Sequence, residues 1–193
     1  MGAILTVKFE ITYRSTFSID WPKLYIVQNN KIIDKQVCDG NKFSFDLEPE
    51  ENNLLELNWY NKTERHTVVD KDVITQDQTF ALLNIRVDNI QIENWFMTEG
   101  IYHPRYFKGF IRQQQEKRIN APLEKKIKSQ LIWHFPGTFT FLEFPKNFWD
   151  WYFNLKQDKE VIKFLEKDPD RIHKFRGSLD PCEDLVKKIK QLI

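Results

Sequence analysis

The feature that most constrains the fold is a pair of alternating runs, separated by a polar excursion, between residues 54 and 93. Apolar residues occupy every second position in both runs, as expected for a strand with one buried and one wet face. The apolar positions are Leu55, Leu57 and Trp59 in residues 54–60, and Leu83, Ile85 and Val87 in residues 79–92. The pattern predicts two strands of a β-sandwich joined by a long, decorated loop.

Further runs rich in β-branched and aromatic residues lie on both sides of this pair. They predict strands over residues 3–14, 23–28, 31–37, 42–47, 130–135 and 138–144. Asn29-Asn30 and Asp39-Gly40 are turn signals between neighbouring strands. Short strands at this spacing are typical of a sandwich or jelly roll. We therefore predict a mainly β fold, an antiparallel, jelly-roll-like β-sandwich over residues 1–145.

The rest of the chain predicts a connection and a helical segment. Residues 94–128 contain scattered aromatics without a period, and we interpret them as a long basic connection with one short helix near residues 111–118. Residues 146–193 predict short C-terminal helices packed on or beside the sandwich. One helix face would carry Phe148, Trp151, Tyr152 and Leu155. Asp158 and Asp180 are the candidate N-caps of two further helices.

Charge is unevenly distributed although the net charge is only +1. Residues 1–100 hold ten basic and sixteen acidic side chains, whereas residues 101–130 hold eight basic and two acidic ones. The small net charge argues against a nucleic-acid partner, and the basic segment predicts docking to protein neighbours. The candidate docking residues are Arg105, Lys108, Arg112, Lys117, Arg118, Lys125 and Lys126.

The sequence contains no motif for catalysis, a disulfide framework or a membrane span. The four histidines lie in separate segments without metal-ligand spacing, and no nucleophile motif or glycine-rich phosphate loop occurs. Cys38 and Cys182 have no pairing pattern, which favours free thiols. The sequence has no run of 18 apolar residues. We therefore expect neither an enzyme nor a membrane protein.

The polar excursion carries acidic residues that could bind calcium. Asp70, Asp72 and Asp77 supply carboxylate oxygens from a loop between strands, which are the ligands that calcium prefers. The alternative is a solvated turn, because Lys62, Arg65 and Lys71 dilute the negative charge. The second interpretation is the stronger one, so no cofactor is expected, with calcium as the alternative.

Aromatic side chains on a surface could stack against the apolar faces of sugars. The candidates are Trp59, Tyr60, Trp95 and Tyr102. The chain contains twenty-eight aromatic residues, so any one of them has the hydrophobic core as its competing interpretation.

The runs LELNWYNKT and LNIRVDNIQIE resemble small jelly-roll domains related to calcium-dependent, xylan-type carbohydrate-binding modules. The resemblance rests on a strand that ends in an acidic or amide loop and a later strand with the pattern of residues 85–90, IRVDNI. The stretch from Phe96 to Pro104 is similar to uncharacterised virion-type proteins of tailed marine phages. Lys62 departs from the pattern, because the modules begin this loop with Asn-Asp and this chain begins it with Asn61-Lys62.

These observations predict a non-catalytic structural or accessory protein of a phage particle, acting through protein–protein contacts. The resemblance implies a place in the virion, with assembly in the host cytoplasm. The alternative function is a carbohydrate-binding module for cell-surface attachment, in which a glycan is the partner.

Overall fold

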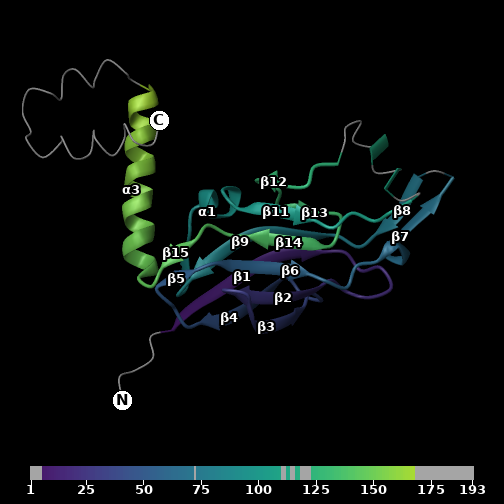
Figure 1. Cartoon of the computed structure of the whole chain (residues 1–193), viewed down its shortest axis with the longest axis horizontal. Helices are drawn as coiled ribbons and strands as arrows, with labels where there is room; N and C mark the ends of the chain where they lie inside the picture. Colours follow the sequence, from purple (N-terminus) through teal and green to yellow (C-terminus); the bar gives the residue numbers. More distant parts are fainter. Residues whose placement is uncertain (1–5, 72, 110–111, 114–115, 118–122, 168–193) are drawn as a thin grey trace, which may run out of the picture. The chain divides into compact units, whose positions relative to one another are not determined.

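The computed structural model describes residues 6–71, 73–109, 112–113, 116–117 and 123–167, with side chains as far as residue 160 (Figure 1). The chain divides into two compact units, Met1–Lys146 and Asn147–Ile193, which are described in turn. Among the described residues, no helix combines the length and the apolar character that crossing a bilayer demands.

The first unit contains a five-stranded antiparallel sheet. Its strands are β1 (Val7–Ser15), β4 (Lys42–Leu47), β9 (Phe80–Val87), β10 (Ile90–Gln91) and β13 (Ile132–Trp133). β1 lies between β4 and β9. The far edge of β9 pairs with β13 near its start and with β10 at its end. Turn residues Asp88 and Asn89 make the β9–β10 hairpin possible, since both adopt positive φ.

A six-stranded antiparallel sheet forms the second layer. Its strands are β2 (Lys23–Gln28), β3 (Lys31–Val37), β6 (Leu55–Trp59), β11 (Ile101–Pro104), β12 (Ile127–Lys128) and β14 (Gly137–Thr140). Their order across the sheet is β12-β11-β14-β6-β2-β3. Asn29 and Asn30 both have positive φ between β2 and β3, which confirms the predicted two-residue turn.

Smaller elements decorate these sheets. β5 (Asn52–Asn53) pairs with β15 (Phe144–Pro145), and the helix α1 covers Asn94–Thr98. The polar excursion is not a plain loop, because it contains a 3-10 helix, η1 (Glu64–His66), and a hairpin of β7 (Thr67–Asp70) and β8 (Val73–Asp77). Figure 1 shows this hairpin extending past the ends of the larger sheets.

The core lies between the inner faces of the two larger sheets. Trp133 of the five-stranded sheet stacks on Tyr102 and Phe139 of the six-stranded sheet, with ring centroids 5.0 and 5.4 Å apart. Other fully buried side chains include Phe9, Ile11, Phe80, Leu24, Ile26 and Leu57. Each such side chain stabilises the fold by about 1.5–3 kcal/mol relative to exposure. This arrangement confirms the predicted antiparallel β-sandwich.

Leu83 was expected on the buried face of its strand, and this expectation is wrong. Its side chain is 48% exposed, whereas Leu82 is buried. The pairing of β1 with β9 shifts register between Thr12 and Tyr13, which leaves Leu83 without a partner residue on β1. Because the bulge inserts one residue, it moves Leu83 to the outer face.

Residues 94–128 were predicted to be a connection, and here the structure differs most from the prediction. It supplies α1, the internal strand β11 and the short strand β12. β11 was not predicted, because it is only four residues long and ends in a proline. Only Tyr102 is buried within it, so its sequence shows no clear alternation of buried and exposed positions. Of the helix expected near residues 111–118, residues 112–113 and 116–117 are helical and the other four lie outside the described residues.

The described part of the second unit contains the helix α3, over Phe148–Lys167. Asn147 caps its start, since Asn147 Oδ1 accepts a 3.3 Å hydrogen bond from the Asp150 N–H. Asp158 was expected to begin a separate helix but lies inside α3, where no turn residue interrupts the chain. The predicted final helix, with Asp180 and Cys182, lies outside the described residues.

Candidate functional site

The outer face of the six-stranded sheet carries a row of aligned polar and aromatic side chains. Residues directly opposite each other on paired strands point to the same side of a sheet. The row runs Lys35, Tyr25, Asn58, Thr138, His103 across five strands. Neighbours in the row are spaced by about 4.8 Å, the separation of adjacent strands.

A stacked pair of tyrosines lies on this surface near the β3 edge of the sheet, with Tyr25 on β2 and Tyr60 just after β6. The rings of Tyr25 and Tyr60 are 4.0 Å apart at their centroids and inclined by only 13°. Lys35 Nζ lies 5.3 Å from the Tyr25 ring centroid, within cation–π range. Tyr60 is 37% exposed. Burial is the first cause that raises the pKa of Tyr60, and the neighbouring Tyr25 raises it further.

Arg105 is held beside the tyrosine pair by main-chain and side-chain oxygens. Its Nη2 donates a 2.6 Å hydrogen bond to the Trp59 carbonyl and a 3.2 Å bond to Asn58 Oδ1. The guanidinium is therefore fixed on an exposed surface, with further N–H donors directed elsewhere. We call the surface formed by Tyr25, Lys35, Asn58, Tyr60 and Arg105 the tyrosine face.

Only one of the four predicted sugar-stacking residues lies on this face. Tyr60 is exposed, whereas Trp59 is fully buried and Tyr102 is 2% exposed. Trp95 is half-buried on α1, away from this row of strands. The sequence analysis missed Tyr25, because its partner Tyr60 follows it by 35 positions and no local pattern joins them.

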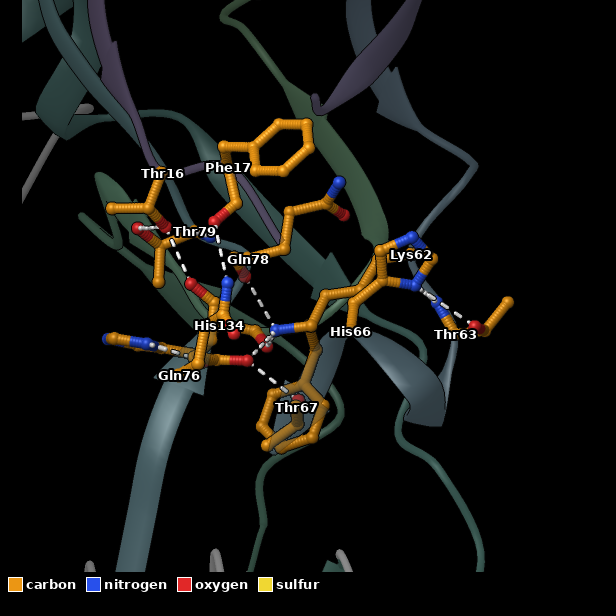
Figure 2. Close-up of polar contacts among 12 residues, drawn as sticks. Thr16, Phe17, Lys62, Thr63, His66, Thr67, Gln76, Gln78, Thr79 and His134 are labelled. Carbon is orange, nitrogen blue, oxygen red and sulfur yellow. Dashed lines mark hydrogen bonds and ion pairs between the residues drawn. The ribbon is translucent and has the colours of Figure 1, made fainter. Parts of the chain in front are cut away.

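A second polar site is buried at the end of the sandwich near the β7–β8 hairpin, and we call it the Lys62 cage (Figure 2). The Lys62 side chain has no exposed area. Its Nζ donates to Asp77 Oδ1 at 2.6 Å and to the carbonyls of Gln78 at 2.6 Å and His134 at 2.5 Å. Burial lowers the pKa of Lys62 and Asp77 acts to raise it, while the three acceptors match the three hydrogens of an ammonium group.

Asp77 is the one carboxylate of the cage. Thr67 Oγ1 also donates to Asp77 Oδ1 at 2.6 Å, and His134 Nδ1 lies 3.5 Å from Asp77 Oδ2. Burial alone would raise the pKa of Asp77, but His134, Lys62 and Thr67 outweigh it and hold that pKa below its usual range. The carboxylate is thus ionised at neutral pH.

A web of hydrogen bonds around Asp20 adjoins the cage. Asp20 Oδ1 accepts hydrogen bonds from Asn61 Nδ2 at 3.0 Å and Gln78 Nε2 at 3.0 Å, and lies 2.9 Å from His66 Nε2. Asn61 Oδ1 in turn accepts from the Lys23 N–H at 2.8 Å. These bonds join loops that are distant in sequence, so the web has a structural role.

The web includes a hydroxyl–imidazole–carboxylate chain that resembles catalytic geometry. Thr63 Oγ1 lies 3.0 Å from His66 Nδ1, and His66 Nε2 lies 2.9 Å from Asp20. However, the Thr63 main-chain N–H also donates to His66 Nδ1 at 3.0 Å. That bond takes the lone pair that a general base would need, so the imidazole acts as a cap of η1.

Two of the calcium candidates, Asp70 and Asp77, lie at opposite ends of the β7–β8 hairpin. Asp70 is exposed and pairs with Val73 at the tip of the hairpin, whereas Asp77 pairs with Thr67 at its base. Asp72 lies outside the described residues. No group of three acidic, histidine or cysteine side chains suitable for a metal occurs in the part of the chain that the structure describes. Because Asp77 is already neutralised by Lys62, the observed donors do not fit calcium.

The predicted docking residues within the described chain all lie between Arg105 and Lys126. Lys108, Lys117, Lys125 and Lys126 are exposed, and Arg112 pairs with Glu116 at 3.0 Å. Arg105 belongs to the tyrosine face, and Arg118 lies outside the described residues. Docking through these residues stays a prediction.

Comparison with known proteins adds two weak structural matches. No protein-family model matches the chain, and no curated protein matches it significantly. One solved structure, vCBM60 in complex with galactobiose, has a TM-score of 0.45 and 6% identity and covers 71% of this chain and 99% of its own. A selenomethionine form of vCBM60, from work linking two families of calcium-dependent carbohydrate-binding modules by circular permutation, has the same TM-score and identity and covers 71% and 91%. Similarity this low carries no functional argument, and neither match bears on an origin in a phage.

Proposed function

We propose that this domain binds a glycan, without catalysis, across the tyrosine face. This is the alternative function from the sequence, and one observation carries it: a stacked tyrosine pair, with Tyr60 exposed, on the outer face of a sheet and bordered by fixed polar groups. A planar ring offers an apolar surface to the C–H face of a sugar, while a few oriented polar groups select its hydroxyls.

The polar border supplies the directional contacts. Asn58 lies directly opposite Tyr25; its Oδ1 accepts a hydrogen bond from Arg105, and its amide group carries two N–H donors. Arg105 is held in place before a ligand arrives, which reduces the entropy lost on binding. The sheet beneath keeps these side chains in register, so the face is preorganised.

The charges on this face favour an acidic sugar. Lys35 and Arg105 are cationic, and the row from Lys35 to His103 contains no carboxylate. A guanidinium binds carboxylate and sulfate groups through paired hydrogen bonds. We therefore propose an oligosaccharide that carries uronate or sulfate groups as the ligand class.

A glycan array followed by calorimetry tests this function. The array should contain neutral, uronate-bearing and sulfated oligosaccharides, and the acidic ones should bind more tightly, with affinity that falls as salt is added. Tyr60→Ala should weaken binding about tenfold or more, which corresponds to about 1.4 kcal/mol.

Leu83→Ala is the matched control, because Leu83 is an exposed apolar residue on the other sheet. It should leave the affinity unchanged. A wild-type array without binding would refute the proposed function. Equal binding to neutral and acidic sugars would remove only the proposed charge preference.

A further inference from the structure

We propose that the Lys62 cage is a cation-binding site whose resident cation is the chain's own ammonium group. With the lysine removed, the cage would take a small primary ammonium ion instead. This inference is independent of the glycan function, since it concerns a different set of side chains at the end of the sandwich.

The cage has the ligand chemistry of a hard-cation site. All three acceptors around Lys62 Nζ are oxygens, one from a carboxylate and two from main-chain carbonyls, at 2.5–2.6 Å. Carboxylate and carbonyl oxygens are also what calcium takes from loops between strands. The oxygens come from the end of β8, from the residue after it, and from the connection between β13 and β14.

The charge and the number of ligands select a monovalent ammonium. Asp77 supplies a single negative charge, which Lys62 balances, whereas calcium would keep an uncompensated positive charge and lack most of its six to eight ligands. Three acceptors match the three hydrogens of a primary ammonium. Besides Lys62, the titratable group beside Asp77 is His134, whose Nδ1 lies 3.5 Å from Oδ2.

The rest of the lysine is enclosed as a ligand would be. The Trp59 ring centroid lies 5.5 Å from Lys62 Nζ, and Trp59 itself is fully buried. Aromatic rings attract ammonium groups most strongly where water is excluded. Oxygen ligands and a ring therefore surround the ammonium, while the peptide chain tethers it.

Chemical rescue tests the cage. Lys62→Ala removes three methylenes and the ammonium, a fragment that n-propylammonium reproduces. This variant should unfold at a lower temperature than the wild type, and n-propylammonium should raise its Tm by about 2–4 °C at saturating concentration. Sodium chloride at the same ionic strength, and neutral n-propanol, should not.

Lys62→Met is the matched control, because its side chain fills the space without supplying an ammonium. n-Propylammonium should leave the Tm of this variant and of the wild type unchanged. Equal shifts in all three proteins would overturn the proposal, as would failure to rescue a folded Lys62→Ala protein.

Two measurements on the wild type keep the proposal testable if Lys62→Ala does not fold. Reductive methylation followed by mass spectrometry should modify the exposed Lys35 and spare Lys62. Neither calcium nor EDTA should shift the wild-type Tm. Methylation of Lys62 at the rate of Lys35, or a Tm raised by calcium, would refute the proposal.

Discussion

At the scale of single residues, the buried ion pair of Lys62 and Asp77 governs this end of the sandwich. Taking two charges out of water costs free energy, which is recovered here because every Lys62 hydrogen finds an oxygen. Removing one partner leaves the other charge buried alone. The pair is therefore most sensitive to substitutions that change one member only.

Asp77→Asn should lower the free energy of unfolding by about 3–5 kcal/mol at pH 7, because it leaves the Lys62 ammonium without its counter-charge. The pKa of Asp77 is lower in the folded protein than in the unfolded chain. Its contribution is thus complete above pH of about 4 and is lost as the pH falls towards the folded pKa. Urea unfolding from pH 7 to pH 3 should show the two proteins converging in stability.

Asp70→Asn is the control for this experiment, since Asp70 is exposed at the tip of the hairpin. It should change stability by less than about 0.5 kcal/mol. If the difference in unfolding free energy between wild type and Asp77→Asn stayed constant down to pH 3, the lowered pKa assigned to Asp77 would be contradicted.

At the scale of elements, β14 pairs with β6, and β11 packs closely against β14. This pairing extends the six-stranded sheet beyond β6. Gly137 lies opposite Pro104 on β11 and opposite Trp59 on β6. A Cβ at this glycine would lie 2.5 Å from the His103 carbonyl oxygen and 2.9 Å from Pro104 Cα. Because these atoms belong to the main chain, they cannot move without displacing β11.

Gly137→Ala should therefore destabilise the first unit by about 1–3 kcal/mol, the usual cost of overpacking. Denaturant unfolding would measure the change. Gly40→Ala is the matched control, since its Cβ would lie 3.7 Å from the Tyr13 hydroxyl, an ordinary contact. Equal stabilities of the two variants would show that β11 shifts freely.

At the scale of the whole molecule, the sandwich is complete within the first unit. Both larger sheets, and the strand β15, end by Pro145. α3 belongs to the second unit, Asn147–Ile193. The strands of the sandwich thus lie between Val7 and Pro145.

A variant truncated after Lys146 should therefore unfold in a single cooperative transition. It should also bind its glycan at the tyrosine face with near-wild-type affinity. Thermal unfolding followed by circular dichroism, together with the calorimetric assay, would check both. A broad transition without a baseline would show that residues after Lys146 are required for folding.

The sequence predicted the elements whose signals are local. Strands β2, β3 and β4 have the predicted ranges, because alternation and the Asn29-Asn30 turn specify them within a few residues. The pairing of Lys62 with Asp77 and with the His134 carbonyl was not predictable, since it joins positions 15 and 72 residues apart. Lys62 was interpreted as diluting negative charge, whereas it forms an ion pair with one of the predicted calcium ligands.

The stretch from Asn58 to Lys62 contributes side chains to both polar sites, the tyrosine face and the Lys62 cage. Asn58 and Tyr60 lie on the outer face, Trp59 lies in the core, and Lys62 fills the cage. Inserting or deleting one residue here would exchange inward and outward side chains and empty the cage in a single step. Natural variants should therefore conserve the length of this stretch and acquire new ligand preferences through replacements on neighbouring strands.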